Sequence, residues 1–166
     1  MALYYLIASL PALTLEGPVP IGRDRFMAAC VTTVSAEVLA DIGLVLDGRE
    51  REAANAWICA WVNRDTQLRN ALARLRSARM DVDEGEYLKE HEGFDVFLEK
   101  SAAEIMGNAN PLERELALAR LRWKMAEDMA VFDAFGLPAV FSYALRLRLA
   151  LRWSGLAADK GRAAVR

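Results

Sequence analysis

The segment that most constrains the fold runs from residue 49 to residue 80 and contains neither glycine nor proline. Those two residues are the strongest helix breakers, so their absence allows one long helix here. Apolar residues recur through the segment at roughly helical intervals, at Ala53, Trp57, Trp61, Leu68, Leu72 and Leu75. The polar group Asn63–Asp65 leaves a break or a bend open. β-branched residues are few along the whole chain, and Ala, Leu, Arg and Glu dominate, which favours an all-α protein.

Glycine, proline and capping residues divide the rest of the chain into further elements. The segment 15–22, rich in glycine and proline, is expected to be a loop, and the apolar run 3–10 before it is compatible with helix or strand. Further helices are expected at about 23–32, 35–46, 94–106, 111–132 and 138–153. Ser35 is a suitable N-cap, and Asn110 is another, with Pro111 in the first helical position.

Apolar stripes predict which helix faces are buried. The helix at 94–106 carries Phe94, Phe97, Leu98 and Ile105 on one side. The helix at 111–132 carries Leu118, Leu121, Met125, Met129 and Phe132 at spacings of three and four. Trp57 and Trp61 lie one turn apart and are expected to share a core-facing side.

We therefore expect a single compact helical domain of five to seven helices at residues 1–153, followed by a frayed basic C-terminal tail, 154–166. A chain of 166 residues can bury an adequate core without disulfides. Its 54% hydrophobic residues and net charge of -2 exclude a disordered chain. The two cysteines, Cys30 and Cys59, are predicted to be buried free thiols of a cytoplasmic protein. The apolar stretch 1–13 is too short for a membrane span and lacks the basic start of a signal peptide.

No recognised catalytic or metal-binding motif occurs in the sequence. Phosphate-loop, dinucleotide, nucleophile-elbow, HExxH and CxxC patterns are all absent. His91, the only histidine, is flanked by acids and is expected to be a solvent-exposed imidazole. The carboxylates are explained by surface ion pairs at helical spacing, so an enzyme using carboxylates and a metal is the least favoured hypothesis. We predict no catalytic, cofactor-binding or metal-binding residue and no cofactor.

Charge is distributed unevenly along the chain. Residues 81–104 hold nine acids and two lysines, a local net charge of -7. Residues 142–166 hold six Lys or Arg and one acid, Asp159, a local net charge of +5. Such blocks are usually solvated faces, and the alternative is that they meet oppositely charged partner surfaces.

Arginines suggest two further hypotheses. The last helix is apolar on nearly every side, which favours a core helix whose arginine stems reach solvent over a basic amphipathic helix lying on a membrane or in a partner groove. Its Arg146, Arg148 and Arg152 are candidate partner contacts. The arginines within 64–79 keep nucleic-acid binding as an alternative, although their spacing scatters them around a helix.

Three blocks carry a family resemblance. They are Tyr4-Tyr5-Leu6-Ile7-Ala8-Ser9-Leu10-Pro11, then Leu68-Arg69-Asn70-Ala71-Leu72-Ala73-Arg74-Leu75-Arg76, and the group Phe132-Asp133-Ala134-Phe135, Tyr143-Ala144-Leu145-Arg146-Leu147 and Arg152-Trp153. Together they resemble a bacterial domain-of-unknown-function family encoded in V-type ATPase operons. That family is distantly similar to the V-type ATPase component that seats the central stalk on the rotor, known as the C-type component in bacterial enzymes and the d-type component in eukaryotic ones.

The resemblance implies an all-helical, non-catalytic part that couples the central stalk to the membrane rotor ring. The expected partners are rotor and stalk subunits, which would hold the protein at the inner face of the membrane without a span of its own. The chain is much shorter than a full C-type component, so a complete three-part funnel is not expected. The alternative is a stand-alone helical regulator that binds nucleic acid.

Overall fold

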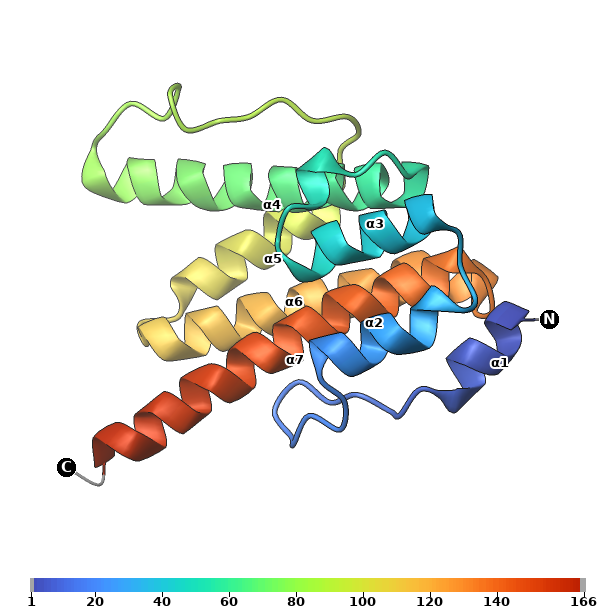
Figure 1. Ribbon diagram of the computed structural model, residues 1–166. Coiled ribbons are helices and arrows are strands. Elements are labelled where there is room, and N and C mark those ends of the chain that lie inside the picture. The colour runs from blue at the N-terminus through green and yellow to red at the C-terminus, as the bar shows by residue number, and fades with distance from the viewer. Residues whose placement is uncertain (1, 165–166) are drawn as a thin grey trace.

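Helix α7 is the central element of the protein. In the computed structural model, which describes residues 2–164, α7 spans Leu137–Ala164 and crosses the whole molecule (Figure 1). It packs against α6 (Pro111–Ala130), α3 (Ala36–Leu46) and α1 (Ala2–Ser9). Its first half is almost wholly buried, because Val140, Phe141, Ala144, Leu145 and Leu147 are at most 1% exposed. This confirms the expectation that the last helix belongs to the core.

The other helices form two groups around α7. Helix α2 (Arg23–Val31) packs on α3, while α4 (Ala56–Met80) lies beside α5 (Val96–Gly107). Two short 3-10 turns, η1 (Glu50–Glu52) and η2 (Val131–Asp133), join neighbouring helices. Residues 2–164 thus contain seven α-helices and no strand, which confirms the all-α prediction.

The core has a main part and a smaller satellite. The main part surrounds α7 and includes Trp61, Phe26 and Ile42, each at most 1% exposed. The satellite lies where α4, α5 and α6 meet and consists of Leu68, Ala71, Leu72, Ala102, Met106 and Leu118. Trp57 stacks on Phe141 with ring centroids 6.0 Å apart, so the two predicted core tryptophans do share the interior.

Local capping signals predict helix starts correctly. The Ser35 side chain accepts a hydrogen bond from the backbone N–H of Val38. The Asn110 side chain accepts one from Leu112, with Pro111 in the first turn. These bonds occupy N–H groups that have no partner within the helix, so a short polar side chain at that position is enough to fix the start.

Several expected boundaries are wrong. The segment from residue 49 begins with η1, and α4 starts only at Ala56, with Asn55 as its N-cap. Helix α4 then continues unbroken through the polar group Asn63–Asp65. Helix α7 does not end at Trp153 but continues to Ala164, because the residues beyond are mainly good helix formers. The proposed separation of 154–166 as a tail remains a prediction, and residues 165–166 lie outside the described part.

Some aromatic residues expected in the core are exposed. Phe94 and Phe97 are 68% and 58% exposed, and Phe132 is fully exposed. The buried face of α5 is instead formed by Leu98, Ala102 and Met106. Helix α6 ends at Ala130, so the stripe of three- and four-residue spacings stops before Phe132.

Candidate partner-binding groove

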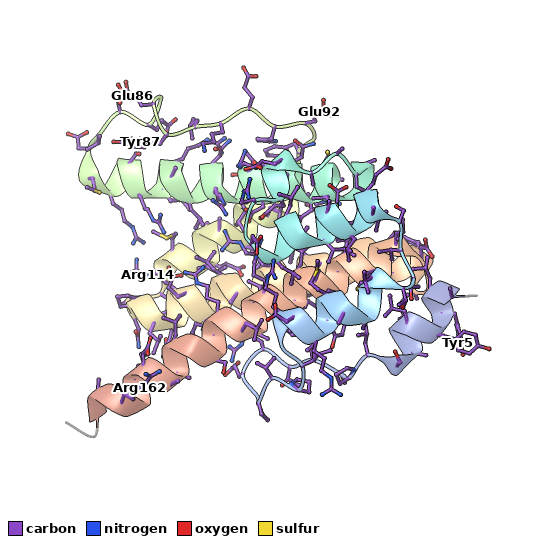
Figure 2. The ribbon with its side chains drawn as sticks, in the orientation of Figure 1. Tyr5, Glu86, Tyr87, Glu92, Arg114 and Arg162 are labelled. Carbon is purple, nitrogen blue, oxygen red and sulfur yellow. The ribbon has the colours of Figure 1, made fainter. Side chains whose placement is uncertain are left out.

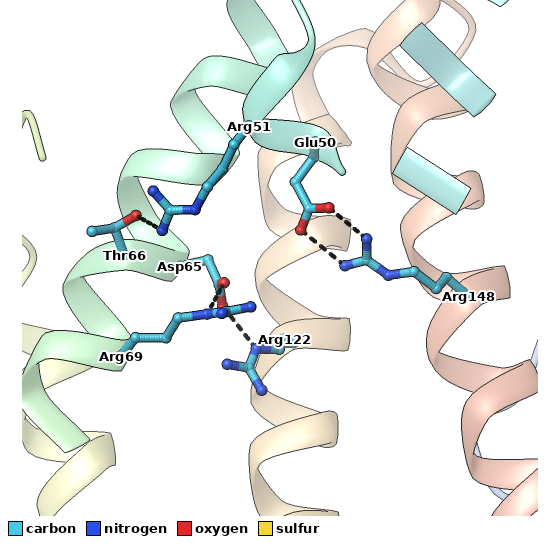
Figure 3. Close-up of polar contacts among 7 residues, drawn as sticks. All are labelled: Glu50, Arg51, Asp65, Thr66, Arg69, Arg122 and Arg148. Atoms are coloured by element: carbon cyan, nitrogen blue, oxygen red, sulfur yellow. Dashed lines mark hydrogen bonds and ion pairs between the residues drawn. The ribbon is translucent and has the colours of Figure 1, made fainter. Parts of the chain in front are cut away.

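Arg148 is held inside the protein by a buried ion pair. Its two terminal nitrogens lie 2.7 and 3.1 Å from the two carboxylate oxygens of Glu50, and Nη1 also donates to the carbonyl of Val45 at 2.6 Å (Figure 3). The Glu50 side chain is 8% exposed and that of Arg148 is 23% exposed. All the contacts of this predicted partner residue therefore serve to join α7, η1 and the end of α3.

Arg146 is likewise engaged within the chain. Its guanidinium donates to Glu127 at 3.2 Å and lies 5.6 Å from the ring centre of Trp123. It also lies 5.9 Å from the ring of Tyr143. Burial lowers the pKa of Arg146, while Glu127 and Tyr143 oppose that shift. Burial also raises the pKa of Tyr143 to about 12, and its hydroxyl donates to the carbonyl of Pro11 at 2.8 Å.

Arg152 is the predicted residue that faces solvent, and three other arginines lie around the same hollow. Arg69 and Arg76 reach it from α4 and Arg122 from α6. The hollow measures about 400 Å³, and Leu72 and Leu118 line it together with Glu115. We call it the arginine groove. It brings together cationic side chains that are up to 83 residues apart in the sequence.

A buried carboxylate holds two of the groove arginines in place. Asp65, whose side chain is 8% exposed, accepts from Nε of Arg122 at 2.8 Å and from Nε of Arg69 at 2.7 Å (Figure 3). Burial is the largest single influence on this carboxyl and raises its pKa. The two guanidiniums together outweigh burial, so the pKa of Asp65 lies below its ordinary value.

The arginines of α4 divide between two sides of the helix. Arg64, Arg74 and Arg79 turn toward the α5 side, where they meet Asp95, Glu99 and the Met106 carbonyl respectively. Arg69 and Arg76 are seven residues apart, a spacing that places both on one helix face, toward the groove. The prediction that these arginines share no single face is confirmed, but the spacing of seven is a sequence signal for the groove that the prediction missed.

A family model described as "Protein of unknown function (DUF2764)" matches residues 48–166, well over half of the chain. The chain belongs to this family. No curated protein and no solved structure matches it. All four arginines of the groove, and Asp65, lie within the DUF2764 segment.

The opposite end of the molecule exposes aromatic side chains, partly outside the DUF2764 segment. Tyr4 and Tyr5 on α1 are 49% and 66% exposed, and Phe132 and Phe135 beside η2 are fully and 56% exposed. The Tyr4 and Phe135 rings lie 5.0 Å apart, and Tyr5 projects away from the body (Figure 2). We call these four residues the aromatic end. Exposed apolar patches of this kind often mark interaction sites.

No set of three or more His, Cys, Asp or Glu side chains suited to a metal ion occurs among residues 2–164. His91 is half-buried rather than solvent-exposed, and its Nδ1 atom is covered. No helix in the same part of the chain combines the length and apolar character needed to cross a membrane.

The two cysteines differ in a way that labelling can measure. Cys30 is fully buried, and burial raises its thiol pKa to about 11, whereas Cys59 is exposed, contrary to the expectation that both are buried. Because the thiolate is the reactive form, we expect one thiol to react quickly with an aromatic disulfide reagent at pH 8 and the other only after unfolding. Cys59→Ser should abolish the fast phase. Two fast thiols in the native protein would contradict the structure.

Proposed function

We propose that this protein is a non-catalytic accessory or central-stalk coupling subunit of a V-type ATPase. The observation that carries the proposal is the aromatic end, an exposed cluster of large apolar rings at one tip of a helical body. Aromatic residues are enriched at protein–protein contacts because they bury a large area on few rotatable bonds. The short blocks shared with the operon-encoded family supply the identity of the assembly.

The layout of charge and apolar surface also supports a connecting role. The aromatic end lies where α1 meets the α6–α7 turn, whereas α4 and α7 end at the other side of the molecule (Figure 1). Glu86 and Glu92 project from the acidic loop beside α4 (Figure 2). A rigid body with different chemistry at its two ends can contact two different neighbours, as a stalk subunit does.

Co-purification under mild conditions tests this proposal. We expect affinity-tagged protein, isolated from its native cell in mild detergent and low salt, to bring down rotor and stalk subunits of the ATPase. Tyr5→Ser with Phe132→Ser should remove them, because exposed rings lose their contact area without loss of the fold.

Tyr87→Ser is the matched control, since Tyr87 is a 64% exposed aromatic residue on the acidic loop instead of the aromatic end. This variant should keep the complex intact. Absence of rotor and stalk subunits from the unmodified protein's eluate would overturn the proposed function. Retention of them by the Tyr5/Phe132 variant would overturn the assignment of the aromatic end as the docking surface.

A further inference from the structure

We propose that the arginine groove binds an acidic amphipathic helix of a partner protein, with glutamate or aspartate side chains seated among Arg69, Arg76, Arg122 and Arg152. The groove lies on other elements than the aromatic end, between α4, α6 and α7. The inference therefore goes beyond the proposed function and does not depend on the partner being an ATPase subunit.

The groove holds cationic groups that the chain itself does not neutralise. Arg76 and Arg152 have no ion-pair partner within residues 2–164. Arg69 and Arg122 give only their Nε atoms to Asp65, so their terminal nitrogens remain available. A guanidinium presents paired N–H groups that match the two oxygens of a carboxylate. Because Asp65 already fixes two of the four, an incoming acid meets donors that are held in place before binding.

The walls of the groove are suited to a polypeptide more than to a small anion. Leu72 and Leu118 line it between the arginines, where the methylene stem of a glutamate can pack. A second hollow adjoins it and shares Glu115, Arg122 and Arg152, and its other walls include Leu149, Trp153 and Leu156. A cationic stretch beside an apolar one is what an amphipathic helix bound in a groove requires.

The negative charges near the groove disfavour a nucleic acid. Glu115 lies within the groove, and its carboxylate would repel a phosphate there. The stretch 81–104, with a net charge of -7, starts directly after α4 and would repel a long polyanion. A protein segment avoids both penalties, because it can place a lysine against Glu115 and carry its acids only where the arginines are.

Binding of a defined peptide to the purified full-length protein tests the inference. The probe is a fluorescein-labelled helical peptide of about 18 residues, with leucines on one face and glutamates beside them. We expect saturable binding by fluorescence anisotropy in about 50 mM salt, weakening as salt is raised. Arg76→Gln with Arg152→Gln should weaken binding about tenfold, since each side chain offers charge-assisted hydrogen bonds.

The control variant is Arg25→Gln with Lys124→Gln, which removes the same charge from exposed positions on α2 and α6 and should bind normally. Equal weakening by both double variants, or full binding by a peptide with glutamine in place of glutamate, would overturn the inference. So would the absence of binding to the unmodified protein. Displacement of the peptide by inorganic phosphate or by single-stranded DNA at lower concentrations than by the unlabelled peptide would assign the groove to phosphates instead.

Discussion

Glu50→Ala is expected to lower the free energy of unfolding by about 3–5 kcal/mol, because it leaves the charge of Arg148 largely buried without its carboxylate. Arg148 would keep only the Val45 carbonyl as a partner, at 2.6 Å. Both guanidinium–carboxylate bonds, at 2.7 and 3.1 Å, are lost at once. Urea denaturation at neutral pH, followed by circular dichroism at the helix band, measures the difference.

Two further variants separate the loss of one partner from the loss of the pair. Glu50→Leu combined with Arg148→Met replaces both charges by apolar groups and should be markedly less destabilising than Glu50→Ala. Glu52→Ala removes a neighbouring acid whose pairing with Arg49 is at the surface, and it should leave the denaturation curve unchanged. If Glu50→Ala and Glu52→Ala had the same effect, the buried pair would not hold η1 to α7.

Asp65→Ala is expected to lower the free energy of unfolding by about 2–4 kcal/mol, because one carboxylate serves two guanidiniums and one of them is mostly buried. The side chain of Arg122 is 18% exposed, whereas that of Arg69 is 58% exposed and can turn to water. Thermal or urea denaturation measures the loss. Asp128→Asn, which removes a surface carboxylate paired with Lys124, should change stability by less than about 0.5 kcal/mol.

The contribution of Asp65 should also depend on pH with a definite sign. Its pKa is lower in the folded protein than in the unfolded chain, so folding is favoured whenever the carboxyl is ionised. That contribution is complete above the ordinary aspartate pKa of about 3.9 and is lost as the pH falls through the folded value. The stability gap between the unmodified protein and Asp65→Asn should therefore narrow below about pH 4. A gap that widened on acidification would contradict the pairing.

Local signals in the sequence predict helix starts better than they predict burial. Ser35 and Asn110 act within three residues of themselves, so neither cap depends on the rest of the fold. Phe132 shows the opposite case, because it continues a helical stripe yet lies beyond the last turn of α6. Whether an apolar ring at such a position is covered depends on which other elements pack nearby, and helical periodicity carries no information about that.

The polar contacts of the groove region depend on pairs that are far apart in the sequence. Asp65 resembles a helix breaker in the sequence because its partner Arg122 is 57 residues away on another helix. Arg148 resembles a surface residue because Glu50 is 98 residues away. The charges themselves are visible in the sequence, but their pairing is not. Only the spacing of Arg69 and Arg76 on α4 could have indicated the groove from the sequence.

The bond from Arg148 to the Val45 carbonyl spans 103 residues and crosses the start of the matched family segment at residue 48. It caps the C-terminal turn of α3 with a cation from the far end of the chain, where the helix dipole favours positive charge. Helices α2 and α3 therefore complete their structure on α7, and α7 completes its burial under them. The edge of the family segment is thus not an edge of folding: the first and last thirds of the chain form one cooperative unit whose closure requires contacts of high sequence separation.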